Sequence, residues 1–207
     1  MRILHISDTH GEMSMLRGQF DLVVHSGDLQ PNRTRGSVTE GAFQEHWVRS
    51  NATRLRHWLG DTPFLFCPGN HDFFDPQEIA RDVGIDWTTL GNKAHEVEGL
   101  RFVGLPYVPF FRGEWNYETC SIELMRKTYR LLESTKPDVL VAHCPPHGIL
   151  DDTHGTHIGN RALTEWLKTR STLKAILCGH CHESAALETF QGCTVSNAAR
   201  MQRIIKL

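Results

Sequence analysis

Residues able to bind metal ions follow five short apolar runs of this sequence, at the point where each run ends. They are carboxylates, imidazoles and one amide: Asp8 with His10, Asp28, Asn70 with His71 and Asp72, His143, and His180 with His182. A mixed set of nitrogen and oxygen ligands suits Mn, Fe, Zn or Ni better than Ca. Two such ions, roughly 3.5–4 Å apart, stabilise both the attacking and the leaving oxygen of a displacement at phosphorus.

Taken singly, these clusters have simpler interpretations. Asn70 and Asp72 follow a Pro-Gly turn signal, so they also fit a polar turn whose side chains bond their own backbone. Asp8 also fits a cap before a helix over residues 13–18. Because the same pattern recurs after five apolar runs, one shared site is favoured over five unrelated turns.

The apolar runs themselves predict the strands that would position these side chains. They cover residues 2–6, 21–25, 64–66, 138–142 and 174–178. Parallel strands joined by crossovers end at the same edge of a sheet, so we expect the five clusters to meet there. An extended backbone would also point Asp8 and His10, two residues apart, to the same side.

Helices and further strands are predicted between these runs. Apolar spacing with one buried face predicts helices over residues 39–59, 76–83, 117–134 and 160–168. Short strands are expected over residues 86–90, 94–97 and 100–105, the last two as a hairpin, and antiparallel closing strands over 185–190, 193–196 and 203–207. No linker or internal repeat interrupts this order, so we expect one domain over residues 1–207.

Composition makes some classes of partner less expected, although a local basic groove for nucleic acid remains possible. The 207 residues carry 22 Lys+Arg against 24 Asp+Glu, a formal net charge of -2, which gives no global support for binding nucleic acid or a membrane surface. No apolar run approaches the roughly 18–20 residues of a membrane span. The six cysteines are scattered and no secretory signal precedes them, so we expect reduced thiols and a cytoplasmic protein.

In chain order the clusters read Asp-x-His, Gly-Asp, Gly-Asn-His-Asp, His and Gly-His-x-His, from Asp8 to His182. This order resembles that of the calcineurin-like metallophosphoesterase superfamily and spans nearly the whole chain. The resemblance implies an α/β (α+β) fold, a four-layer αββα double β-sandwich with a dinuclear metal site at the strand C-terminal ends. It also implies two divalent metal ions as cofactors.

The resemblance further implies a role for each motif residue. The first metal ion would be held by Asp8, His10 and His182, the bridge between the ions would be Asp28, and the second ion would be held by Asn70, His143 and His180. His71 would face the phosphate as the acid for the leaving group, and Asp72 would orient its ring.

Several branches of the superfamily share these motifs. Residues 143–151 (HCPPHGILD) resemble small stand-alone phosphoesterases related to cyclic-nucleotide phosphodiesterases. Serine/threonine phosphatases carry Arg shortly after the second and third motifs, where this chain has Leu29-Gln30 and Phe73-Phe74. Residues 3–8 also resemble the nuclease subunit of double-strand-break repair, but this chain ends too early for that family's DNA-binding cap.

A loop over residues 106–115 carries four aromatic residues, and its prolines predict the absence of regular structure. Such a loop either covers the core or forms a rim on which a base can stack. We expect Tyr107, Phe110 and Trp115 to contact substrate, with His147 at the entrance.

The expected reaction is hydrolysis of a phosphate ester, with a phosphodiester such as a cyclic nucleotide as the first choice. The metals would lower the pKa of a bridging water towards about 7, and the resulting hydroxide would attack in line. The expected partner is a small phosphate ester such as a nucleotide, nucleic acid is a less favoured partner, and no membrane is expected. The alternatives are a nuclease, a phosphomonoesterase, or a non-catalytic binding scaffold with this fold.

Overall fold

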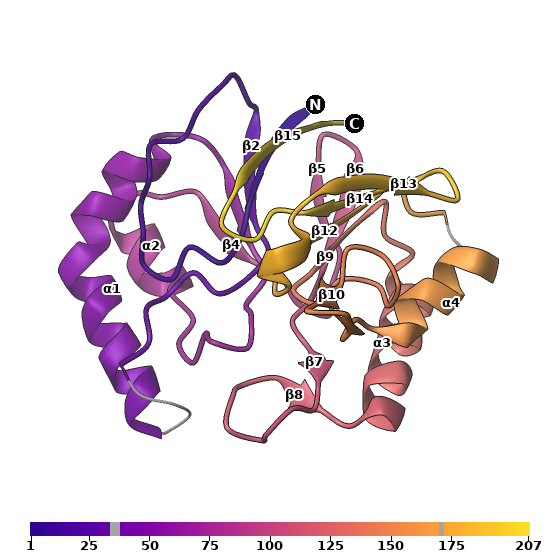
Figure 1. Ribbon diagram of the computed structural model, residues 1–207. Helices are drawn as coiled ribbons and strands as arrows, with labels where there is room; N and C mark the ends of the chain where they lie inside the picture. Colours follow the sequence, from indigo (N-terminus) through magenta and orange to yellow (C-terminus); the bar gives the residue numbers. More distant parts are fainter. Residues whose placement is uncertain (34–37, 170–171) are drawn as a thin grey trace.

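The fold was obtained as a computed structural model, which describes residues 1–33, 38–169 and 172–207. Two β-sheets face each other, and helices cover the outer face of each sheet (Figure 1). Helices α1 (Val38–Leu59) and α2 (Gln77–Asp82) lie outside the first sheet, and α3 (Ser121–Thr135) and α4 (Arg161–Thr169) lie outside the second. The predicted αββα sandwich is therefore confirmed.

The first sheet carries three of the predicted site strands. Its order is β15 (Gln202–Lys206), β1 (Arg2–Ile6), β2 (Leu22–His25), β3 (Phe64–Phe66) and β4 (Trp87–Thr89). Strands β1 to β4 are parallel, and β15 closes the edge antiparallel to β1. Since the parallel strands all end on the same side, the segments that follow β1, β2 and β3 lie next to one another.

The second sheet carries the other two predicted site strands, β9 (Val139–Ala142) and β12 (Ala175–Cys178). Its order is β13 (Leu187–Phe190), β14 (Cys193–Asn197), β12 (Ala175–Cys178), β9 (Val139–Ala142), β6 (Leu100–Leu105) and β5 (His95–Val97). The predicted hairpin is present as β5 and β6. The expectation that all closing strands are antiparallel is wrong for β14, which pairs in parallel with β12 and antiparallel with β13.

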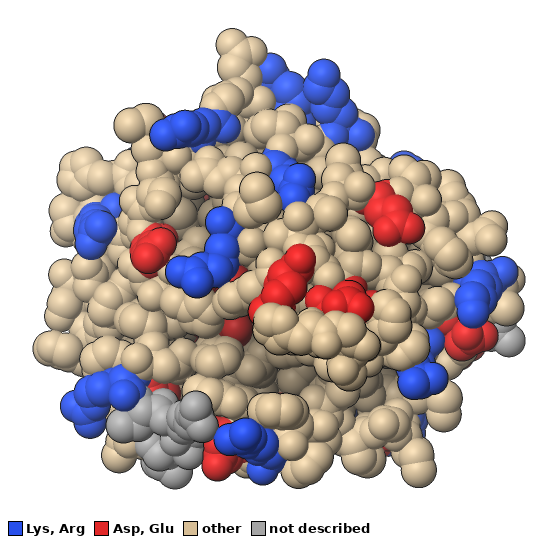
Figure 2. All heavy atoms as spheres, in the orientation of Figure 1, with Lys and Arg blue, Asp and Glu red and all other residues tan. Residues whose placement is uncertain are grey.

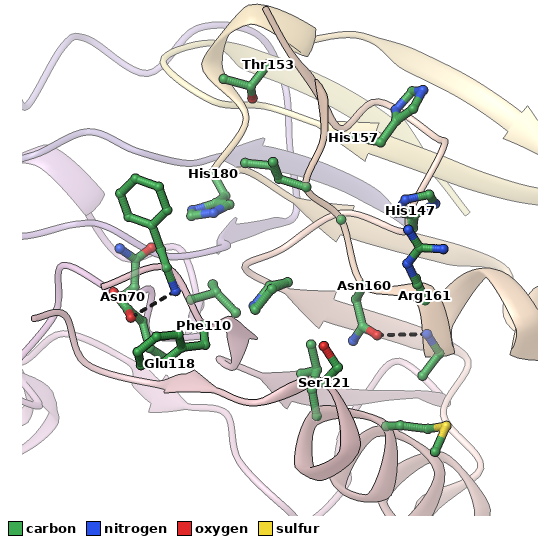
Figure 3. A pocket seen from close by; sticks show the side chains of 18 of the residues that line it. Asn70, Phe110, Glu118, Ser121, His147, Thr153, His157, Asn160, Arg161 and His180 are labelled. Atoms are coloured by element: carbon green, nitrogen blue, oxygen red, sulfur yellow. Dashed lines mark hydrogen bonds between the residues drawn. The ribbon is translucent and has the colours of Figure 1, made fainter. Parts of the chain in front are cut away.

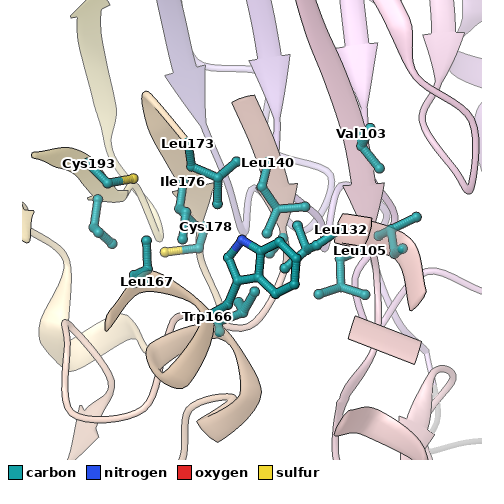
Figure 4. Packing of buried hydrophobic residues seen from close by; sticks show 14 of the residues in the cluster. Val103, Leu105, Leu132, Leu140, Trp166, Leu167, Leu173, Ile176, Cys178 and Cys193 are labelled. Atoms are coloured by element: carbon teal, nitrogen blue, oxygen red, sulfur yellow. The ribbon is translucent and has the colours of Figure 1, made fainter. Parts of the chain in front are cut away.

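Alternating side chains of the strands fill three apolar layers. In β1, Ile3 points into the layer between the two sheets, whereas Leu4 points into the layer under α1 and α2. In β9, Val141 faces the first sheet and Leu140 faces α3 and α4. Figure 4 shows Trp166 of α4 packed among the side chains of that outer layer. The central strands are buried on both faces, which explains why they read as continuous apolar runs.

Short elements border the site and correct two predictions. The aromatic loop does contain regular structure, because β7 (Val108–Pro109) pairs in parallel with β8 (Glu118–Thr119), and proline is tolerated at such an edge. The helix predicted from residue 117 begins only at Ser121, since β8 occupies the intervening residues. A small hairpin of β10 (Asp152–Thr153) and β11 (Thr156–His157) and the short 3₁₀ helix η1 (His182–Ser184) complete the elements. Among the described helices, none has the length and apolarity that crossing a bilayer requires.

Candidate metal centre

The five polar clusters meet where the C-terminal ends of the two sheets adjoin. Asp8 and His10 follow β1, Asp28 follows β2, and Asn70 follows β3, all in the first sheet. The histidines His143, His180 and His182 follow β9 and β12 in the second sheet. The expectation of one sheet edge is therefore wrong in this respect, because the site is shared between two sheets.

The backbone at these strand ends is left-handed rather than extended. The φ angles are 55° at Asp8, 46° at His10, 58° at Asp28 and 66° at His180. Asp and His are enriched among the non-glycine residues that tolerate this conformation, although it remains strained. Hydrogen bonds hold it: the Asp8 N–H donates to the Gly27 carbonyl at 2.9 Å, and the His10 N–H donates to the Asp28 carbonyl at 2.9 Å.

Potential ligand atoms converge in three overlapping groups, in each of which they lie within 4.8 Å of one another. The groups are Asp8 with His10 and His182, Asp8 with Asp28 and His143, and His10 with Asp28 and His71. His182 Nε2 lies 3.0 Å from Asp8 Oδ1, and His143 Nε2 lies 3.3 Å from Asp28 Oδ2. The first group contains the three residues that the motifs assign to the first metal ion.

His143 shows best how well these residues suit a cation. Its Nδ1–H donates to the Ser26 carbonyl at 2.8 Å, so the Nε2 lone pair of a neutral ring points at Asn70 Oδ1, 3.1 Å away, and at Asp28 Oδ2. Three acceptor atoms that face one another need a proton or a metal ion between them. Burial lowers the pKa of His143, but the charge of Asp28 outweighs it and raises that pKa to about 9. His180 is adjacent, with its ring centroid 5.0 Å from that of His143.

Two glycines of the motifs allow the backbone to approach the buried carboxylates. A Cβ at Gly69 would overlap the Asp28 carboxylate, and a Cβ at Gly179 would overlap that of Asp8. Both carboxylates are almost fully buried. Burial alone would raise their pKa values, but His143 beside Asp28 and His182 beside Asp8 hold them below the usual range. The site therefore presents two ionised carboxylates in a buried setting, which favours a multivalent cation.

His71 is fixed by two neighbours that the motif did not indicate. Its Nδ1–H donates to Asn32 Oδ1 at 2.8 Å, and the Trp115 ring packs on it at a centroid distance of 3.9 Å. Asn32 also donates to the His71 carbonyl at 3.1 Å. Burial lowers the pKa of His71, and the charge of Asp28 opposes that shift. No spacing rule in the sequence could have indicated Asn32, which lies in a polar loop 39 residues away.

The prediction that Asp72 orients the His71 ring is wrong. Its carboxylate accepts the backbone N–H groups of Asp28 at 2.7 Å, Gly69 at 2.8 Å and Gln30 at 3.1 Å. Burial and the charge of Asp28 raise the pKa of Asp72 to about 7, against the effect of these donors. Asp72 thus fastens the turn after β2 to the turn after β3 and acts on the backbone of the site, because its two oxygens are already engaged there.

A pocket of about 820 Å³ opens from Asn70, His71 and His180. Three of the four residues predicted to contact substrate line it, namely Phe110, Trp115 and His147. In Figure 2 this face of the molecule is hollowed below its centre, and the walls are mostly uncharged. The hollow has the size of a site for a small organic ligand.

Tyr107 is the exception among the predicted substrate residues. It does not line this pocket; its ring packs on Tyr117 at 5.8 Å and lies under the Lys127 ammonium group at 4.2 Å. The aromatic loop is instead shaped by Glu118, whose carboxylate accepts the N–H groups of Phe111 at 3.1 Å and Arg112 at 2.9 Å. Both interpretations of the loop hold in part, because Tyr107 covers the core and Phe110 forms a rim.

Comparison with known proteins decides the family. The family model of the calcineurin-like phosphoesterases matches residues 1–184, which include every residue of the candidate metal centre. The chain belongs to the calcineurin-like phosphoesterase family. This family membership makes it a metal-dependent phosphoesterase, a hydrolase that acts on phosphate esters.

The fold of this calcineurin-like phosphoesterase also recurs among solved structures. One crystal structure superposes with a TM-score of 0.69 at 15% identity, and the match covers 96% of this chain and 90% of the other. At that identity the likeness concerns the fold alone. A search of curated proteins gave no match.

Proposed function

We propose that this phosphoesterase hydrolyses phosphodiesters with two divalent metal ions, Mn, Fe, Zn or Ni, bound between its two sheets. The observation that carries the proposal is the convergence of two buried carboxylates, Asp8 and Asp28, with the ring nitrogens of His10, His143 and His182 beside an open pocket. When bound, such ions lower the pKa of a water molecule and offset the negative charge of a phosphate.

The proposed ligands divide between the two ions as the motifs imply. They are Asp8, His10 and His182 for the first ion, Asp28 shared by both, and Asn70, His143 and His180 for the second. The hydrogen bond from His143 Nδ1 to Ser26 supports this assignment because it directs Nε2 towards the other donor atoms.

We further propose that His71 protonates the leaving oxygen. Asn32 holds the Nδ1–H of His71, so Nε2 is the nitrogen left to carry that proton. A competing role is that of a ligand, since His71 also lies in one group with His10 and Asp28. The two roles predict different outcomes when His71 is removed.

Preference for a diester is supported by the pocket. The walls beyond Asn70 and His71 are mainly apolar, with exposed Phe110, Ile122 and Met125 among them. Such walls suit the organic group of a phosphate ester, which can pack against them. A cyclic nucleotide is one such substrate. The alternative functions are those of a nuclease, a phosphomonoesterase or a non-catalytic scaffold. We also propose a cytoplasmic location, because all six thiols are free.

The test combines metal analysis with a series of aryl phosphodiesters. Metal-stripped protein should regain about two ions per chain with Mn²⁺ and then hydrolyse bis(4-nitrophenyl) phosphate faster than 4-nitrophenyl phosphate. His71→Ala should lose about 10²–10⁴-fold on a phenyl diester but much less on the nitrophenyl diester, because only the poor leaving group needs the proton.

Three results would contradict parts of this proposal. If the protein binds no metal and shows no activity after addition of Mn²⁺, the scaffold hypothesis holds instead. Faster hydrolysis of the monoester removes the diester preference. Equal losses on both diesters, with metal content lowered in His71→Ala, make His71 a ligand rather than the acid.

A further inference from the structure

The pocket has a second polar end, away from the metal centre. His147, His157 and Arg161 line it, and Figure 3 shows all three on the side opposite to Asn70 and His180. None of the three belongs to the proposed metal ligands. The question is what this end of the pocket recognises.

The backbone brings these three residues together. The His147 N–H donates to the carbonyl of Asn160 at 3.1 Å, which places the neighbouring Arg161 next to His147 at the start of α4. The ring centroids of His147 and His157 are 5.6 Å apart. Two imidazoles and a guanidinium group therefore share one wall of the pocket.

A buried carboxylate fixes the His157 ring. Its Nδ1–H donates to Asp151 Oδ1 at 2.7 Å, and Asp151 is fully buried. The same carboxylate accepts the N–H groups of Gly148 at 2.9 Å and Gly159 at 2.8 Å, so it anchors the loop as well. Half of the His157 side chain remains exposed, and Nε2 is the nitrogen left for a ligand.

The carboxylates near this end are engaged elsewhere. Glu165 pairs with Lys168 at 3.1 Å, and Glu118 accepts the backbone N–H groups of the aromatic loop. Arg161 carries a permanent charge and a planar fork of donors that matches phosphate and carboxylate oxygens. The lining also includes apolar and aromatic side chains, among them Met125, Tyr129 and Ile158.

We propose that this end is a second anion subsite, which binds a phosphate or carboxylate group on the part of the substrate that is not hydrolysed. The inference rests on the proposed function and adds the substrate class. That class is a phosphate ester with a second anionic group, separated from the scissile phosphate by a ring or chain that packs on the apolar lining. Arg161 and His157 bind the anion and take no part in the reaction.

The test uses two matched substrates and the Mn²⁺-loaded protein. Thymidine 5′-(4-nitrophenyl phosphate) and its 3′-phosphorylated form have the same leaving group and differ only in the second phosphate. We expect kcat/KM to be about tenfold higher for the 3′-phosphorylated form, the scale of one charged hydrogen bond. A 3′-O-succinyl form distinguishes a carboxylate from a phosphate as the preferred anion.

Variants assign the effect to the subsite. Arg161→Met should bring the ratio of the two kcat/KM values close to one, and Arg161→Lys should restore part of it. His157→Asn, in which the amide can still donate to Asp151, should lower the ratio as well. Arg49→Met removes a cation of α1 that pairs with Glu45, and neither residue lines the pocket, so this variant should leave the wild-type ratio unchanged.

The outcomes separate this inference from the proposed function. A wild-type ratio of one or below, or a ratio that Arg161→Met leaves unchanged, overturns the subsite while the hydrolysis itself stands. If neither substrate is cleaved, the proposed diesterase function fails and the subsite inference falls with it.

Discussion

The two ends of the pocket are built in opposite ways. At the metal end, Asp8 and Asp28 are almost fully buried and have a left-handed backbone conformation. They follow strands β1 and β2 of the first sheet within three residues. At the far end, the His157 side chain is 50% exposed and Arg161 is exposed, and they belong to a small hairpin and to the start of α4, outside the two sheets.

This difference indicates a division of labour. Side chains locked by buried hydrogen bonds keep the geometry that a reaction needs, whereas side chains on loops can vary without disturbing the scaffold. Changes at the metal end should therefore reduce hydrolysis of every substrate. Changes at the far end should alter which substrate is preferred.

The largest effect is expected for Asp28→Asn. Loss of the charge should weaken metal binding and lower kcat by about 10³-fold or more on all substrates, because the electrostatic stabilisation of the reacting phosphate is lost. Addition of Mn²⁺ should raise the melting temperature of the wild type but not that of the variant. Asp61→Asn, at a carboxylate that is 93% exposed, is the matched control. An Asp28→Asn variant with wild-type activity would remove Asp28 from the metal centre.

A smaller effect is expected for Asn32→Ala, which leaves all proposed ligands in place. Without its hydrogen bond the His71 ring is no longer held in one tautomer, so hydrolysis of a phenyl diester should fall about 10–100-fold. Metal content should stay at the wild-type value, and Asn32→Asp, which keeps an acceptor for Nδ1–H, should recover part of the rate. Equal losses for nitrophenyl and phenyl diesters would show that Asn32 does not act through His71.

The smallest effect is expected for Phe110→Ala. Loss of one exposed ring from the rim should raise KM about fivefold for substrates with a large organic group and leave kcat nearly unchanged. Stability should change by no more than about 0.5 kcal/mol, as for other exposed positions. Leu187→Ala, at an apolar side chain 53% exposed on β13, is the control. A fall in kcat without a change in KM would place Phe110 in the reaction rather than on the rim.

Much of the fold was predictable because its strands are short, buried on both faces and therefore apolar throughout. The strands that precede Asp8, Asp28 and His143 were predicted within a residue or two, and the helix predicted from residue 39 is α1. The start of α3 was not predictable, because residues 117–119 continue the spacing of the helix that follows, but Glu118 and Thr119 pair with β7 instead. Strand pairing prevailed over the helical pattern there.

The sequence by itself determined which residues can bind metal and that they follow strands, since both properties are local to each motif. Tertiary structure alone decided the neighbours: Asn32 rather than Asp72 beside the His71 ring, and Tyr107 away from the pocket. It also decided that His157 rests on buried Asp151 at the far end. Such contacts depend on how loops from different strands pack together, and the packing of a loop is not encoded in the periodicity of its own residues.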